Sequence, residues 1–224
     1  RFVYPSSIAV HGRNASQSHP LLEDEAIAPR TLYGVTKRAM EQAGTWLSEE
    51  CGRMLEQTPG GSLDFRSIRY PGLLSAETLP SGGTSDYAPE MVHAAVRGED
   101  GTCFVPRHAR LPFMIMPEAA EATLALASAP RSCLKQNVYA VGGFAPTAAE
   151  LEEALQERFP DFEVEYDVHP IRSEIVDSWP ADVDDSAARR DWGFRRGLDL
   201  AAALDDYLIP GIRNAHGQNQ TECE

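Results

Sequence analysis

The chain has 224 residues, of which 42% are hydrophobic, and its 34 acidic and 20 basic residues give a formal net charge of −14. This length and apolar content suffice for one large or two small domains with a hydrophobic core. Lys and Arg are scattered along the chain rather than clustered, which argues against nucleic acid as a partner, and no apolar run approaches the ~18 residues of a membrane span.

The predicted elements alternate between strands and helices. In chain order they are a strand at 2–4, a long loop up to residue 30, a helix from Tyr33 to about Met54, a strand at 63–70, a loop at 71–87, a helix at 86–97, strands at 102–106 and 111–116, a helix at 117–129, a strand at 137–141, a helix at 148–159, a strand at 162–168, helices at 184–193 and 198–208, and a polar tail at 214–224. Thr147 and Glu150 form a capping box for the helix at 148–159. This alternation predicts an α/β fold with a doubly wound parallel sheet.

Cysteine and histidine spacing gives no sign of a metal centre. The four cysteines (Cys51, Cys103, Cys133 and Cys223) form no C-x-x-C pair, and the six histidines form no H-x-x-x-H pair. We therefore expect free thiols in a reducing compartment and no bound metal. The cytoplasm fits this expectation, and in a eukaryote the mitochondrial matrix fits it too.

The opening stretch "FVYPSSIAVHG" predicts a strand that runs directly into Pro5, Ser6 and Ser7. In open α/β sheets, ligands bind beyond the carboxyl ends of the strands. Ser7 precedes Tyr33 by 26 residues, and its hydroxyl can share a substrate oxygen with the phenol.

Tyr33 and Lys37 are four residues apart in the predicted helix, so their side chains lie on one face. A Lys ammonium beside a phenol favours the ionised phenol, and a nicotinamide ring would add a second cation. Tyr33 is thus a candidate general base. The pair alone is a weak signal, because Tyr and Lys at this spacing occur by chance on many solvated helix faces. The same helix carries an apolar stripe formed by Val35, Ala39, Met40, Ala43, Trp46 and Leu47.

Three segments together resemble one enzyme superfamily. "SSIAVHG", "YGVTK" and "RYPG" are similar to the strand-end serine, the Tyr-Lys segment and the following strand of the extended short-chain dehydrogenase/reductases, the superfamily of NAD-dependent epimerases and dehydratases. "RTLYGVTKRAMEQAG", "GGTSDY" and "DSWP" more narrowly resemble the NAD-dependent L-threonine 3-dehydrogenases. The resemblance covers nearly all of the chain from Arg1 to Leu208.

This resemblance implies a Rossmann fold, NAD as cofactor and oxidation of L-threonine to 2-amino-3-ketobutyrate. It implies catalytic roles for Ser7, Tyr33 and Lys37. Cofactor contacts are implied for Pro5, Ser6, Tyr33, Lys37, Tyr70, Pro71 and Gly72. Contacts with the amino acid substrate are implied for Ser7, Tyr33, Gly83, Thr84, Ser85 and Trp179. The loop of Gly82, Gly83 and Thr84 can also offer backbone N–H groups to a carboxylate. A homodimer packed through the Tyr33 helix is implied as well.

The sequence departs from the family pattern in two places. The Gly-rich turn that binds the NAD pyrophosphate is not found here, and "VGGF" at 141–144 is interpreted as an ordinary turn. We therefore expect the Gly-rich turn to lie before Arg1, the chain to represent the C-terminal two-thirds of an enzyme, and this piece to be inactive by itself. His11 stands where related enzymes often carry an aromatic ring, and we interpret it as a loop-facing ring rather than a proton relay.

The expected domains follow from the resemblance. Residues 1–75 and 110–143 would form the NAD-binding domain without its first strands, and residues 76–109 and 144–213 a smaller α/β substrate domain.

Two alternative functions remain open. A sugar-nucleotide epimerase or dehydratase would need a larger and more basic pocket, and the scarcity of Lys and Arg near "GGTSDYAPEM" counts against it. A non-catalytic NAD-binding protein on the same fold would be expected to lack one of the three catalytic side chains.

Overall fold

The computed structural model describes residues 1–12, 19–51 and 63–221, with side chains up to residue 215. The chain forms two compact units, each assembled from three segments. Unit 1 comprises Arg1–Pro71, Pro117–Gly142 and Ser178–Arg196. Unit 2 comprises Gly72–Met116, Gly143–Asp177 and the chain from Gly197 onwards.

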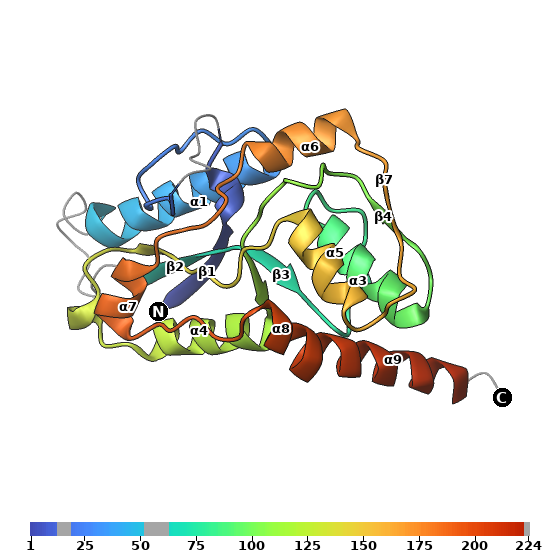
Figure 1. Cartoon of the computed structure of the whole chain (residues 1–224). Coiled ribbons are helices and arrows are strands. Elements are labelled where there is room, and N and C mark those ends of the chain that lie inside the picture. The colour runs from blue at the N-terminus through green and yellow to red at the C-terminus, as the bar shows by residue number, and fades with distance from the viewer. Residues whose placement is uncertain (13–18, 52–62, 222–224) are drawn as a thin grey trace. The chain divides into compact units, whose positions relative to one another are not determined.

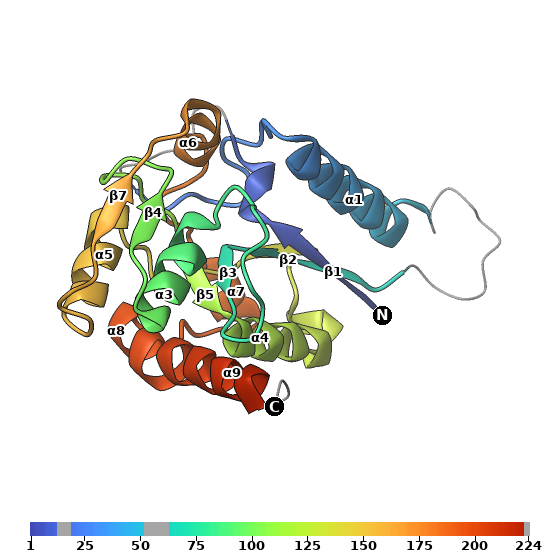
Figure 2. The same ribbon diagram turned by 90° about the vertical axis from the view of Figure 1, so that its right-hand side faces the viewer.

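Unit 1 is built around a parallel sheet with strand order β1-β2-β6. Its elements are β1 (Phe2–Ser7), the 3-10 turn η1 (Ile8–Val10), α1 (Leu32–Glu49), β2 (Phe65–Tyr70), α4 (Met116–Ser128), the 3-10 turn η2 (Arg131–Cys133), β6 (Val138–Ala140) and α7 (Ser186–Trp192). In Figure 2, β1 and β2 lie side by side, and Ser7 is paired in register with Tyr70. The last residues of these two strands therefore share one edge of the sheet.

Helices cover both faces of this sheet. Successive side chains of β2 point alternately to α1 on one face and to α4 on the other. All six residues of β2 are buried. Phe65 and Arg69 face α1, since the Phe65 ring packs at Gly44 and Arg69 pairs with Glu41. Arg66 and Tyr70 face α4, where they bond to its backbone carbonyls. A central strand buried on both faces is typical of a doubly wound parallel sheet, as the alternation of elements predicts.

Unit 2 contains two short parallel strand pairs, β3 with β5 and β4 with β7. Its elements are β3 (Gly72–Leu74), α3 (Tyr87–Arg97), β4 (Gly101–Cys103), β5 (Phe113–Ile115), α5 (Ala148–Gln156), β7 (Val164–Tyr166), α6 (Pro170–Asp177), α8 (Leu200–Ala202), the π-helix η3 (Ala203–Leu208) and α9 (Ile209–Thr221). The capping box of Thr147 and Glu150 is present at the start of α5. Figure 1 labels these elements except β5 and η3, and Figure 2 labels β5.

Three segments differ from the sequence-based prediction. The expected loop at 71–87 contains strand β3, because the Pro71-Gly72 pair does not end the extended backbone, which pairs with β5. Helix α6 was not expected, since its exposed face leaves few buried apolar positions to form a pattern. The last helix continues to Thr221 rather than ending at 208. Its Pro210 directly follows the π-helical segment η3, with which α9 is continuous.

The expected bounds of the NAD-binding and substrate domains remain a prediction. Residues 178–196 belong to unit 1, whereas the sequence analysis assigned them to the substrate domain. The two units are defined by compactness, whereas the predicted domains are defined by which ligand they bind. The unit boundaries therefore do not test the predicted domain boundaries.

The face of α1 that packs on the sheet is made of small and polar residues. Gly34, Glu41, Gly44 and Ser48 are buried, and a Cβ on Gly44 would lie 2.2 Å from the Phe65 ring. All six residues of the predicted apolar stripe are exposed. The stripe is therefore not the core-facing side of α1 within this chain.

Candidate active site

The candidate site begins where β1 ends. Ser7 is the last residue of β1, and its Oγ accepts a hydrogen bond of 3.2 Å from the Ala9 amide, which starts the turn η1. Ser6 points the other way, and its buried hydroxyl donates to Glu41 Oε1 at 2.6 Å. The structure thus gives these adjacent serines different surroundings. Ser7 remains half-buried at the edge of the sheet, and Ser6 is engaged below it.

Helix α1 approaches this strand end closely at its first turn. The Thr31 hydroxyl caps α1 by accepting a 3.0 Å hydrogen bond from the Gly34 amide. A Cβ on Gly34 would lie 2.1 Å from the Ala9 carbonyl oxygen, so only glycine permits this approach. Because Gly34 follows Tyr33 directly, this packing holds the start of α1 against the turn that follows Ser7.

Lys37 lies between two aromatic rings. Its Nζ is 5.3 Å from the centroid of the Tyr33 ring and 5.0 Å from that of the Tyr4 ring, and it donates a hydrogen bond to the Pro5 carbonyl. Partial burial lowers the pKa of the Lys37 ammonium from its ordinary value. The predicted neighbours Tyr33 and Lys37 are therefore in contact, and 54% of Tyr33 is exposed, which leaves the phenol accessible to a ligand.

The last residue of β2 and the two residues after it are three further predicted cofactor residues. The Tyr70 hydroxyl donates to the Ala119 carbonyl and bonds to the Thr123 hydroxyl, and burial raises the pKa of Tyr70. Its polar end is therefore engaged with α4. Pro71 is buried. Gly72 begins β3 and packs against the Phe113 ring, from which a Cβ on residue 72 would lie only 2.6 Å away. Cofactor contact by these residues stays a prediction.

A buried charge cluster lies beneath the strand ends, and the sequence analysis did not include it. The Glu41 carboxylate accepts hydrogen bonds from Arg69 Nε and NH2, both at 2.8 Å, and from Arg38 NH1 at 3.0 Å. Despite its burial, the pKa of Glu41 is lowered by Arg69 and by the hydrogen bonds from Ser6 and Arg38. A weak signal was present, since Glu41 follows Lys37 by four residues and Arg69 stands inside "RYPG".

His11 is fully buried next to this cluster. Its Nδ1 is 2.9 Å from the Glu25 carbonyl oxygen, so the ring contacts the loop before α1. Burial and the positive charge of Arg69 lower the pKa of His11 to about 4. His11 is therefore neutral at physiological pH.

The neutral state of His11 predicts a specific loss of stability in mild acid. Above pH 6.5 His11 is uncharged in both folded and unfolded chains, but between pH 6.5 and 4 only the unfolded chain takes up its proton. The free energy of unfolding should fall across this window by about 3 kcal/mol relative to a His11→Asn variant, and no further below it. Urea unfolding of both proteins at pH 7, 5.5 and 4 measures this, and parallel curves for the two proteins would contradict it.

The predicted substrate loop belongs to unit 2 and is held by its own side chains. Asp86 Oδ2 accepts hydrogen bonds from the amides of Gly83 at 2.7 Å and Ser81 at 3.0 Å. Arg172 donates to the Gly83 carbonyl and stacks on the Phe104 ring. In this structure a carboxylate of the chain itself accepts the hydrogen bond of the Gly83 amide, and contact of Gly83 with a substrate stays a prediction.

The remaining predicted substrate residues have different settings. Thr84 and Ser85 are half-buried in the loop at 83–85. Trp179 belongs to unit 1, and its side chain is almost entirely buried, with 7% exposed. The closing role that the resemblance implies for Trp179 stays a prediction.

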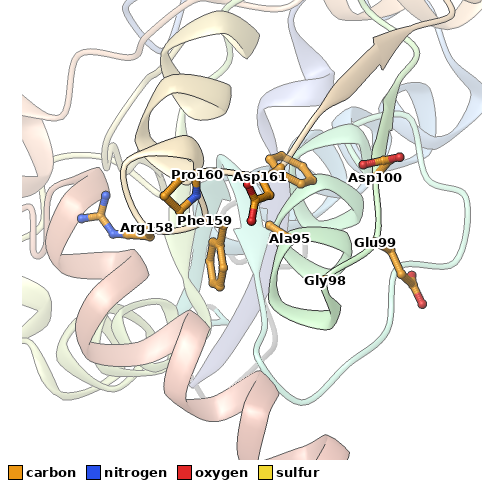
Figure 3. A pocket seen from close by; sticks show the side chains of 9 residues that line it. Ala95, Gly98, Glu99, Asp100, Arg158, Phe159, Pro160 and Asp161 are labelled. Atoms are coloured by element: carbon orange, nitrogen blue, oxygen red, sulfur yellow. The ribbon is translucent and has the colours of Figure 1, made fainter.

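A cavity of about 280 Å³ opens in unit 2 at the end of α3 (Figure 3). Its lining residues are Ala95, Gly98, Glu99, Asp100, Arg158, Phe159, Pro160, Asp161 and Phe162. None of these is a predicted site residue. Arg158 is moreover engaged by Asp205, with which its Nε forms a 2.5 Å ion pair.

Neither a metal centre nor a membrane helix is found in the part of the chain that the structure describes. No three His, Cys, Asp or Glu side chains within residues 1–12, 19–51 and 63–221 are grouped so that they could hold a metal ion. Among the same residues, no helix is long and apolar enough to cross a bilayer.

Comparison with known proteins places this geometry in a family. The sequence model of the NAD dependent epimerase/dehydratase family matches residues 1–142, more than half of the chain. The chain belongs to this family. The match covers β1, α1, β2, α4 and β6 and thus every element that carries Ser7, Tyr33 and Lys37.

Within the NAD dependent epimerase/dehydratase family, similar proteins are described as L-threonine dehydrogenases. The mitochondrial L-threonine 3-dehydrogenase of Bos taurus is 36% identical over 217 residues, which cover 97% of this chain and 54% of the relative. The crystal structure of L-threonine dehydrogenase from Phytophthora infestans is 37% identical with a TM-score of 0.84, over 94% of this chain and 65% of that one. A monomeric L-threonine 3-dehydrogenase from a metagenome is 35% identical with a TM-score of 0.84, over 95% and 65% of the two chains. This chain spans about half the length of the curated relatives it matches.

Proposed function

We propose that the full-length protein that contains this chain oxidises L-threonine to 2-amino-3-ketobutyrate with NAD. The observation that carries this proposal is the contact of the Lys37 ammonium with the half-exposed Tyr33 ring beside the end of β1, where Ser7 lies. The similarity to L-threonine dehydrogenases over more than nine-tenths of the chain supports the choice of substrate.

In the proposed mechanism, three side chains act on the 3-hydroxyl of threonine. Ser7 holds the hydroxyl at the edge of the sheet through a hydrogen bond. Tyr33 Oη takes the hydroxyl proton as general base, and the C3–H hydride would pass to the nicotinamide that NAD supplies when bound. Lys37, whose Nζ lies 5.3 Å from the centroid of the Tyr33 ring, places a positive charge beside the phenol. A ketone then stands where the alcohol was, and Tyr33 carries the proton until solvent removes it.

The residues present fit the nicotinamide riboside end of NAD. An ammonium has three N–H donors. Within the described residues, the Lys37 ammonium uses one of them, in a hydrogen bond to the Pro5 carbonyl oxygen. Its remaining donors suit the vicinal hydroxyls of a ribose. When bound, NAD supplies the hydride acceptor. Pro5, Ser6, Tyr70, Pro71 and Gly72 are proposed as the surrounding contacts, with the Ser6 hydroxyl excepted because Glu41 accepts its bond.

The substrate proposal for the loop rests on its rigidity and composition. Asp86 and Arg172 hold the backbone at Gly83, and Gly83 together with the side chains of Thr84 and Ser85 is proposed to contact a small zwitterion. Trp179 is proposed to border the same substrate.

Absorbance at 340 nm tests the proposed function directly. The full-length protein with NAD should produce NADH when L-threonine is added and none when a UDP-sugar is added. UDP-sugar interconversion without a threonine-dependent signal would instead identify a sugar-nucleotide epimerase with the same three catalytic residues. Tight NAD binding with neither reaction would identify a non-catalytic NAD-binding protein.

We also propose that the full-length protein forms a homodimer through α1. The exposed stripe of Val35, Ala39, Met40, Ala43, Trp46 and Leu47 is an apolar surface of the kind that interfaces cover. A similar L-threonine 3-dehydrogenase is described as monomeric, so the oligomeric state needs a direct measurement. Sedimentation velocity at micromolar concentration should show a dimer.

We propose a reducing compartment from the free thiols Cys51, Cys103 and Cys133, which is the cytoplasm or the mitochondrial matrix.

A further inference from the structure

The Glu41 carboxylate lies beside the candidate site and is hydrogen-bonded at both of its oxygens. Its two oxygens accept four hydrogen bonds: Oε1 accepts from Ser6 and Arg69, and Oε2 accepts from Arg69 and Arg38. Glu41 is fully buried and Arg69 is 2% exposed. The Arg69 guanidinium also donates to the Glu23 carbonyl. This arrangement satisfies the acceptor capacity of the carboxylate from three different elements.

These elements are the ones that carry the predicted catalytic residues. Glu41 lies one helical turn after Lys37 on α1. Ser6 precedes Ser7 at the end of β1, and Arg69 pairs in register with Ser6 on β2. The carboxylate therefore joins α1, β1 and β2 at the level where the site is built.

Stability alone does not account for such a cluster. Burying two charges costs a large desolvation free energy, and well-packed apolar residues in place of a buried ion pair are often neutral or stabilising. What the charges add is directionality, since each hydrogen bond fixes one partner at one place. The hydroxyl of Ser6 is fixed in this way.

We propose that Glu41 is a positioning residue that acts through Ser6 on the catalytic residues. Two contacts hold the last residues of β1 on α1: Pro5 accepts from Lys37, and Ser6 donates to Glu41. Together they set the distance between the strand end and the helix, and so place the Ser7 hydroxyl relative to the Tyr33 phenol. This inference rests on the proposed function.

Ser6→Ala in the full-length protein tests the link without unbalancing charge, because the Glu41–Arg69 pair stays intact. Ser67→Ala is the matched control. Ser67 is also a fully buried serine of the same sheet, and its hydroxyl donates a 3.1 Å bond to the Tyr4 carbonyl on β1. Both substitutions remove one buried hydrogen bond to or from β1, but only Ser6 contacts Glu41.

We expect Ser6→Ala to lower kcat for L-threonine oxidation by about tenfold or more, because small misplacements of reacting groups are costly. The KM for threonine and the affinity for NAD should stay close to the wild-type values. Ser67→Ala should leave kcat unchanged. Equal kcat values for the two variants, or an effect of Ser6→Ala confined to KM, would overturn the proposal.

A second readout separates this inference from the proposed function. The rate at which an amine-reactive acylating reagent labels Lys37, measured by mass spectrometry relative to Lys135, reports the Lys37 environment without any substrate. Ser6→Ala should raise the Lys37 rate and Ser67→Ala should not. If the wild type does not oxidise threonine, the proposed function fails, whereas an unchanged Lys37 rate in Ser6→Ala overturns the positioning role.

Discussion

Replacement of Tyr33 by Phe in the full-length protein is expected to lower kcat for L-threonine oxidation by about 10²- to 10⁴-fold, the range typical of a lost general base. The variant lacks the oxygen that receives the substrate proton. Its ring keeps the face that Lys37 contacts at 5.3 Å, so the ammonium should remain in place and NAD affinity should change little. NADH formation at 340 nm measures kcat, and titration calorimetry measures NAD binding.

Tyr4→Phe is the control for this substitution. Tyr4 also presents its ring to Lys37, at 5.0 Å, and burial together with nearby Tyr33 raises the pKa of Tyr4. Loss of its hydroxyl removes a phenol from the same neighbourhood without removing the proposed base, so kcat should stay near the wild-type value. Comparable losses in both variants, or parallel loss of NAD binding in Tyr33→Phe, would mean that Tyr33 has been wrongly assigned as a base.

Local spacing was sufficient to predict the core of this candidate site. The four-residue interval places Tyr33 and Lys37 on one face of a helix whatever the rest of the chain does, and the structure has them in contact. The strand at the start of the chain likewise predicts that Ser7 stands at the edge of a parallel sheet, which the pairing with β2 confirms. Both inferences depend on the geometry of a single element.

Features that depend on pairing between distant segments were not predictable in the same way. Glu41 and Arg69 are 28 residues apart in the chain, and a charged residue on a helix is usually solvated, so nothing local marks them as buried partners. The orientation of α1 is a similar case. Its apolar stripe is exposed, whereas Gly34 faces the turn η1 and Gly44 faces the sheet, because only a residue without Cβ fits against Ala9 and Phe65.

The loop at 83–85 illustrates a third limit. Glycines in "GGTSDY" indicate backbone amides that are open to a ligand, but the sequence does not say whether the chain uses those amides itself. The Asp86 carboxylate three residues after Gly83 accepts the bond, as Asp side chains commonly do in turns. Contact of Gly83 with a substrate therefore stays a prediction.

The buried ion pair predicts the largest loss of stability. Arg69→Met leaves the Glu41 charge buried with its main partner removed, which typically costs about 3–5 kcal/mol of unfolding free energy. Arg97→Met is the matched control, because the Arg97–Glu99 pair is largely exposed and such pairs contribute about 0–1 kcal/mol. Urea unfolding at pH 7 measures both, and equal small effects would show that the buried pair contributes no more than a surface pair.

The pH dependence distinguishes a lost ion pair from a merely disturbed core. In the wild type the pKa of Glu41 is lowered, so its contribution to stability is present above the ordinary Glu pKa of about 4.3 and is lost as the pH falls through the lowered folded-state value. In Arg69→Met, burial without the guanidinium raises the pKa of Glu41 instead, and protonation then relieves the folded state. The stability gap between wild type and variant should therefore narrow as the pH falls from 7 towards 4. The comparison is made in a His11→Asn background, because Arg69 also lowers the pKa of His11, which titrates in the same window. There, a packing defect alone would leave the gap constant, because a cavity carries no charge to titrate.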